Sequence, residues 1–171
     1  KDGVVETTSE YEVGGDGNAN RWMNGTGHPI RVPVIDLAEV SAGGGSIAWI
    51  DPGGALKVGP QSAGAEPGPV CYDAGGTRPT VTDCNLALGY LDSEALLAGR
   101  LAIRADKAMT AIEEHLASPL GIGVDEAAAG VLNVVNAAMA EALRIVSVER
   151  GHDAREFSLV AFGGAGPMHA A

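Results

Sequence analysis

Apolar positions follow two different periods along this chain, and each period predicts one kind of element. Apolar residues recur at helical spacing over 105–117 and 125–148, which predicts two amphipathic helices. The segment 3–13 is rich in β-forming residues and predicts an edge strand, and the short apolar run 157–162 predicts a buried strand. The pattern as a whole therefore predicts a mixed α/β fold.

Glycine and proline divide the middle of the chain into short elements. The turn signals at 41–45 and 51–54 predict a three-strand meander with strands over 30–40, 46–51 and 55–58. Pro33 places the first of these strands at an edge or a bulge, because proline has no N–H for the ladder.

The segments around the meander predict loops and short helices. Residues 14–28 and 59–80 predict loops, and the second is long enough to suggest a function. A short helix is predicted with Thr82 or Asp83 as its N-cap, and a second short helix is predicted over 92–98.

Two glycine clusters are the strongest candidates for chemistry. The first, 41–45, lies between two predicted strands, and the second, 163–167, follows the strand predicted over 157–162. Consecutive backbone N–H groups in a turn can bind an anion, and a strand–turn–helix unit can hold a ligand at the end of its strand. We therefore interpret 41–45 as a hairpin turn that holds nucleotide phosphates. Plain turns are the alternative, because most glycine-rich loops bind nothing.

Composition narrows the classes of function. The chain has 171 residues, enough for one domain with a real core, and its formal net charge is −11, which argues against nucleic acid as a partner. No apolar run near 18 residues was found, so we expect no membrane partner and a soluble, cytoplasmic protein. Cys71 and Cys84 match no zinc spacing and are expected to be idle thiols. The chain begins at Lys1 without Met, and we expect it to be a piece of a longer protein.

Several segments together resemble the hydantoinase A / 5-oxoprolinase family, which includes subunits of acetone-type carboxylases. The likeness runs from about residue 30 to residue 171, in the family's order and spacing. The segments are VIDL at 34–37, AGGGSIA at 42–48, VGPQSAGAEPGP at 58–69, PTVTD at 79–83, SVERG at 147–151 and FGGAGP at 162–167.

The resemblance implies an actin-like, ribonuclease H-like ATPase fold, of which this chain would be the C-terminal half of a two-domain nucleotide cleft. It implies residues 1–29 as a lead-in strand and loop, and 30–171 as a single truncated family domain. ATP and Mg²⁺ are the implied cofactors. The implied nucleotide-binding residues are Ala42, Gly43, Gly44, Gly45, Ser46, Gly163, Gly164 and Ala165.

Asp36 and Asp83 are the candidates for catalysis and for metal contact, with a turn or capping role as the alternative for each. The implied activity is ATP-dependent opening of a cyclic amide such as hydantoin, N-methylhydantoin or 5-oxoproline, through phosphorylation of its carbonyl. The implied partners are the substrate, the N-terminal half of the same protein and a hydantoinase B-type subunit.

Two departures leave the branch of the family open. Ser41 stands where actins and heat-shock chaperones have an Asp and where this family usually has Gly, and Ala38 stands where part of the family has His. The alternatives are a carboxylase subunit, a kinase of the same fold, and a regulatory piece that does not catalyse. Surface roles are expected for His28, His115 and His152, a packing role for His169, and either a phosphate contact or an ion pair for Arg150.

Overall fold

The computed structural model divides the chain into two compact units, each of two segments. The first unit comprises residues 1–40 and 141–156, and the second comprises 41–140 and 157–171. The described residues are 5, 7–9, 11–13, 28–35, 37, 40, 42–94 and 103–170. The loop predicted at 14–28 lies outside them except for His28, and most of the short helix predicted at 92–98 also does.

The described strands of the first unit form two small antiparallel pairs. β1 (Thr7–Thr8) pairs with β4 (Val34–Ile35), and β2 (Tyr11–Val13) pairs with β3 (His28–Ile30). The prediction of one strand over 30–40, leading a meander, is therefore wrong. Pro33 lies between β3 and β4, where its missing N–H interrupts a continuous ladder.

The sheet of the second unit is a hairpin of β5 (Ser46–Ile50) and β6 (Leu56–Ser62). The turn predicted at 51–54 is confirmed: the Asp51 carboxylate accepts hydrogen bonds from the backbone N–H groups of Gly53 and Ala55, both at 2.9 Å. β6 runs beyond the strand predicted at 55–58. The predicted meander is thus reduced to two strands.

Helix α1 (Val81–Ala87) begins earlier than predicted. Its N-cap is Thr80, not Thr82 or Asp83, because the Thr80 hydroxyl accepts a hydrogen bond from the Asp83 N–H while the Asp83 carboxylate accepts one from the Thr80 N–H. This reciprocal capping box satisfies two backbone donors at the helix start.

The helix predicted over 105–117 continues three residues further than expected. It consists of α2 (Ala105–Ile112), one π-helical turn (η3, Glu113–Ala117) and α3 (Ser118–Leu120). Pro119 lies within its last turn. The helix ends at Gly121, whose φ of 69° is left-handed.

Helix α4 (Val124–Val146) agrees with the helix predicted over 125–148. By length and composition alone, Val124–Arg150 could cross a membrane, contrary to the expectation that no such apolar run exists. Its first half, however, packs into the core of the second unit. The core cluster into which it packs comprises Ala48, Val81, Cys84, Ile112, Leu116, Ala117, Ala127, Ala128, Val131, Leu132 and Val135.

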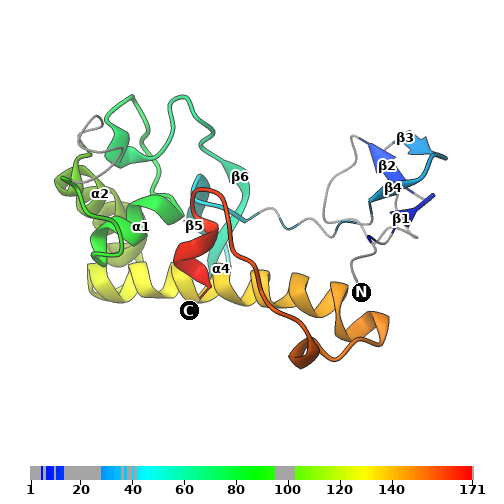
Figure 1. The fold of residues 1–171 in the computed structure, drawn as a ribbon. Coiled ribbons are helices and arrows are strands. Elements are labelled where there is room, and N and C mark those ends of the chain that lie inside the picture. The colour runs from blue at the N-terminus through cyan, green and yellow to red at the C-terminus, as the bar shows by residue number, and fades with distance from the viewer. Residues whose placement is uncertain are drawn as a thin grey trace. The chain divides into compact units, whose positions relative to one another are not determined.

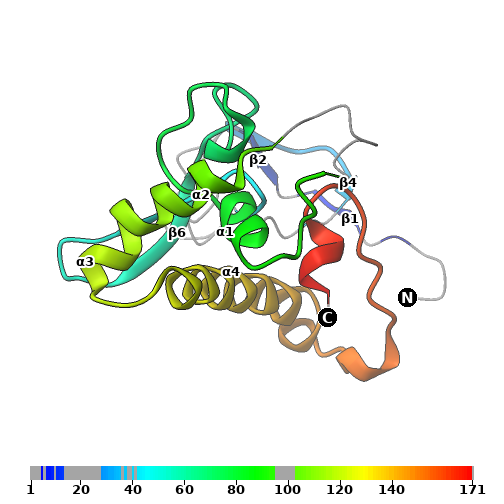
Figure 2. The ribbon, with the colours of Figure 1, turned by 90° about the vertical axis from the view of Figure 1, so that its left-hand side faces the viewer.

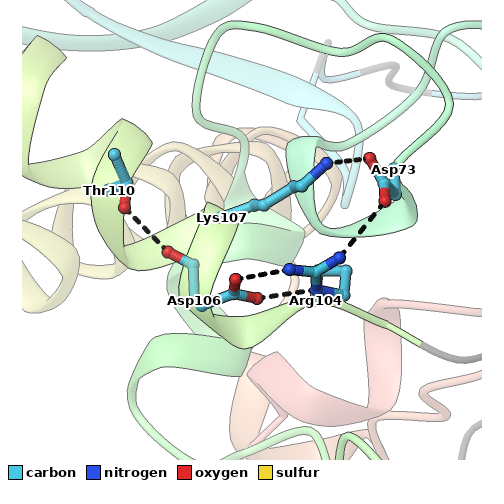
Figure 3. Close-up of polar contacts among 5 residues, drawn as sticks. All are labelled: Asp73, Arg104, Asp106, Lys107 and Thr110. Carbon is cyan, nitrogen blue, oxygen red and sulfur yellow. Dashed lines mark hydrogen bonds and ion pairs between the residues drawn. The ribbon is translucent and has the colours of Figure 1, made fainter.

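The second unit also contains a long loop between β6 and α1, which agrees with the loop predicted to end at residue 80 (Figure 1). The loop contains a single 3-10 turn, η1 (Val70–Tyr72), and Figure 3 shows how it is tied to α2. Asp73 forms ion pairs with Arg104 and with Lys107, and the Arg104 backbone N–H donates to the Cys71 carbonyl at 2.8 Å.

The segment 157–162 is not the buried strand that its apolar character predicts. It has no strand pairing in the structure, and Val160 and Phe162 are 74% and 83% exposed. A strand needs a neighbouring strand for its backbone hydrogen bonds, and none of the described residues provides one. The segment leads into a 3-10 turn, η6 (Gly166–His169), at the place where a helix start was predicted.

Candidate functional site

The first glycine cluster forms a tight turn that leads into β5. It does not join two paired strands as predicted, because β4 pairs with β1 and β5 pairs with β6. We call residues 42–46, which begin the β5–β6 hairpin, the hairpin turn. The Ser46 N–H donates to the Gly43 carbonyl at 3.0 Å, and the Gly43 N–H donates to the Ser46 hydroxyl at 3.0 Å. The Gly44 carbonyl accepts from both the N–H and the hydroxyl of Thr82, each at 2.9 Å. The start of α1 therefore holds the tip of the turn from one side.

Two consecutive backbone N–H groups of the hairpin turn have no acceptor among the described residues. Within the described part of the chain, the N–H groups of Gly44 and Gly45 have no hydrogen-bond acceptor, whereas the carbonyls of both residues are used. Adjacent N–H groups in a turn form a concave site with a partial positive charge. The hairpin turn can therefore accept an anionic oxygen without any cationic side chain.

Glycine is needed in this turn for close approach, not for unusual backbone angles. A Cβ on Gly44 would lie 2.7 Å from the Thr82 hydroxyl oxygen, and a Cβ on Gly45 would lie 2.8 Å from that of Ser62. Neither residue has a positive φ. A Cβ on Gly43 would meet nothing within 4 Å, so this side of the turn is open.

The second glycine turn, residues 163–165, lies against the hairpin turn. A Cβ on Gly44 would be 3.5 Å from the Ala165 Cβ, although the two residues are far apart in sequence. Gly163 has a φ of 91°, a conformation that favours glycine, and a Cβ on Gly164 would meet nothing within 4 Å. The structure thus brings the two predicted glycine clusters together on one wall (Figure 1).

Asp83, a predicted catalytic and metal-binding residue, lies in the interior. One carboxylate oxygen accepts from the N–H groups of Val70 and Thr80 and from the Thr80 hydroxyl, and the other accepts from the Cys71 N–H at 2.8 Å. The side chain is fully buried. The structure therefore gives Asp83 the capping role, and a metal or catalytic role finds no support in its surroundings.

The rest of the predicted metal site is not defined. Asp36 lies outside the described residues, and the residues that are described contain no cluster of three or more His, Cys, Asp or Glu side chains that could hold an ion. We therefore assign Mg²⁺ to no residue of this chain.

The burial and the raised pKa values of the two cysteine thiols support the expectation that these thiols are unreactive. Both are fully buried, and burial, reinforced by the nearby Asp83 charge, raises the pKa of each thiol far above its usual range. Because the thiolate is the reactive form, neither group can act as a nucleophile at neutral pH.

Thiol labelling tests this burial. We expect Cys71 and Cys84 to resist a disulfide reagent at pH 8 in the native protein and to react once urea unfolds it. The protein is digested after quenching, and the peptides that carry the two residues are quantified by mass spectrometry. Rapid labelling of either peptide without denaturant would contradict the buried position.

The match to a known family covers the whole chain. The model of the family described as hydantoinase/oxoprolinase matches residues 1–171. The chain belongs to this family. Among curated proteins it is 57% identical over 95% of its length to an uncharacterised protein of Methanocaldococcus jannaschii. It is 50% identical over 91% to the caprolactamase alpha subunit of Pseudomonas jessenii, and 37% identical over 82% to 5-oxoprolinase 1 of Arabidopsis thaliana.

Solved structures of this hydantoinase/oxoprolinase family share the fold. Nucleotide-free acetone carboxylase, from work on ATP-dependent acetone carboxylation, matches with a TM-score of 0.78 and 34% identity over 83% of this chain. The ATP-dependent caprolactamase of Pseudomonas jessenii matches with a TM-score of 0.70 and 48% identity over 89%. The chain spans 24%, 22% and 12% of the three curated relatives and about a fifth of each solved chain.

Sequence reasoning missed three polar residues around the two turns of this family member, and it gave a fourth, Thr82, a capping role that the structure assigns to Thr80. Thr80 and Thr82 support α1 and the hairpin turn, and Asn85 and Asn136 contact His169. Thr80 and Asp83 have the spacing of a capping box, in which Asp takes the place of the usual Glu or Gln. This spacing could have revealed the start of the helix. The asparagines had no local signal, because their partner lies far away in sequence.

Proposed function

We propose that this chain forms one wall of the phosphate site in an ATP-dependent enzyme that opens a cyclic amide. The observation that carries this proposal is the pair of N–H groups on Gly44 and Gly45, which lack an acceptor among the described residues and lie at the turn where Ala165 meets Gly44. Phosphate oxygens bind to such groups, and they need no basic side chain in a chain whose net charge is −11.

The family supplies the reaction. Relatives named ATP-dependent caprolactamase and 5-oxoprolinase support a reaction in which ATP phosphorylates the amide carbonyl oxygen and water then opens the ring. Catalysis of phosphoryl transfer depends on positioning and on neutralising charge. The contribution of this chain is to orient the phosphates through rigid backbone donors that need no rearrangement during the reaction.

The resemblance also supports an architecture for the whole enzyme. We infer an actin-like cleft in which this chain is the C-terminal half, closed by the N-terminal half of the same protein and assembled with a hydantoinase B-type subunit. The name of the caprolactamase alpha subunit supports a partner subunit. ATP use supports a cytoplasmic location. The isolated residues 1–171 would then have little activity, because half of the cleft is missing.

A carboxylase subunit is the second candidate. The TM-score of 0.78 to acetone carboxylase supports it, and the same phosphate wall would serve phosphorylation of a ketone enolate. The identity is 50% to the caprolactamase alpha subunit and 46% to the acetophenone carboxylase gamma subunit, and we place the cyclic amide first on this small difference.

Substrate-stimulated ATP hydrolysis tests the proposal. We expect the full-length enzyme, with its partner subunit, to release ADP at least about tenfold faster with hydantoin, 5-oxoproline or caprolactam than without a substrate. Acetone or acetophenone with bicarbonate serves as the comparison. Stimulation by the ketones alone would favour the carboxylase, and no stimulation by either class would favour a kinase or a non-catalytic role.

A further inference from the structure

Three polar residues from distant parts of the second unit meet beside the second glycine turn. His169 of η6 lies between Asn136 of α4 and Asn85 of α1, which are 33 and 84 residues away in sequence. Figures 1 and 2 both show η6 close to these two helices. The cluster joins the segment after the second glycine turn to the helix that supports the hairpin turn.

The hydrogen bonds define which ring nitrogen of His169 carries the proton. The Asn136 side-chain oxygen lies 2.7 Å from Nδ1, so Nδ1–H donates and the ring is held by this bond. The Asn85 amide nitrogen donates to the Val81 carbonyl at 3.0 Å, and its other N–H faces Nε2 at 3.5 Å. With this N–H facing it, Nε2 is assigned as the acceptor, which corresponds to a neutral ring protonated on Nδ1. Partial burial, which lowers the pKa of His169, favours the same form.

Asn85 has a feature that packing alone does not explain. Its side chain is fully buried, and within the described chain its Oδ1 atom has no hydrogen-bond partner. An unsatisfied buried oxygen destabilises a fold, whereas an apolar residue of similar size would not. The Asn85 side chain therefore lowers the stability of the fold through its oxygen, while its amide nitrogen contacts His169.

The position of His169 connects this cluster to the two turns. The Ala165 carbonyl accepts the Met168 N–H at 3.0 Å, so Ala165 and His169 belong to one short hydrogen-bonded turn. Ala165 in turn lies against Gly44, whose carbonyl is held by Thr82 of α1. Anchoring His169 to α1 and α4 thus sets the distance between the second glycine turn and the hairpin turn.

We propose that His169, anchored by Asn136 and Asn85, is a positioning residue that holds the second glycine turn against the hairpin turn and so sets the affinity for the nucleotide. This inference rests on the proposed nucleotide site. It assigns His169 no proton transfer, and it replaces the packing role that the sequence suggested.

Kinetics of variants in the full-length enzyme test this role. We expect His169→Ala to raise KM for ATP about tenfold and to change kcat little, because the turn is displaced while the phosphate donors remain. Asn136→Ala is expected to do the same, and the double variant to be no worse than either single one. His115→Ala, at an exposed helical position, is the matched control and should match the wild type.

Rescue separates positioning from acid–base chemistry. A glutamine can donate to Asn136 and accept from Asn85, so His169→Gln should restore most of the ATP affinity. A general base would not be rescued by an amide, and loss of kcat in both His169 variants would overturn the proposal. Asn85→Leu should raise KM for ATP without lowering the unfolding midpoint, since it removes the unpaired oxygen together with the contact.

Hydrogen exchange gives a readout that is independent of turnover. Amides of the peptide covering 163–170 should exchange faster in His169→Ala than in the wild type, with His169→Gln close to the wild type. Unchanged exchange and unchanged KM in His169→Ala would refute the anchor. If the wild-type enzyme itself does not bind ATP, the proposed function fails, and an exchange difference would still show whether His169 positions the turn.

Discussion

Gly44→Val is expected to reduce nucleotide affinity by at least about 100-fold in the full-length protein. A Cβ at this position would lie 2.7 Å from the Thr82 hydroxyl oxygen and 3.5 Å from Ala165, so the side chain would push apart the groups that hold the hairpin turn. The N–H groups of Gly44 and Gly45, which lack an acceptor among the described residues, would then be displaced from the proposed phosphate position. Isothermal titration with ADP or a non-hydrolysable ATP analogue measures the change.

Two milder variants make this result interpretable. Gly43→Ala adds a methyl group on the open side of the turn, so it should leave the unfolding midpoint unchanged and lower affinity only if the ligand approaches there. Gly123→Ala, where a Cβ would also meet nothing within 4 Å, lies just before α4, away from the two glycine turns in sequence, and should leave nucleotide affinity unchanged. Normal affinity in Gly44→Val would show that phosphate does not bind at the hairpin turn.

Asp83→Ala is expected to destabilise the second unit by about 3–5 kcal/mol, because it leaves three buried backbone N–H groups and one hydroxyl without their acceptor. The N–H groups belong to Val70, Cys71 and Thr80, so the start of α1 and the η1 turn should loosen together. Thermal unfolding of the full-length protein measures the loss. Labelling of Cys71 and Cys84 reports whether the loss is local, since both thiols should become reactive.

A matched substitution and an assay of magnesium-dependent activity complete this experiment. Asp106→Ala removes an exposed carboxylate that forms an ion pair with Arg104, and it should change the unfolding midpoint little. If Asp83 instead bound Mg²⁺, the variant would keep the stability of the wild type and lose magnesium-dependent activity. That outcome would contradict the capping role.

Local signals were sufficient wherever a residue's neighbours in sequence decide its conformation. The turn after β5 and the helix α4 both follow from glycine, aspartate and apolar spacing within a few residues. The extent of β6 and the start of α1 were missed by a few residues, because a strand extends as far as its partner permits and a capping box can start a helix earlier. The prediction of a buried strand over 157–162 failed for a different reason. Its apolar residues indicate burial, but burial requires a partner segment.

At the candidate site, too, the sequence predicted the glycine clusters, whereas tertiary packing decided their contacts. From the sequence alone came the mixed fold, the family resemblance, and the two glycine clusters as candidate nucleotide-binding segments. Only the tertiary structure showed that Gly44 is needed because Thr82 approaches it, that Asp83 caps a helix, and that His169 joins two asparagines. Spacing along a chain encodes local backbone preference, whereas a contact between residues 84 positions apart depends on how whole elements pack.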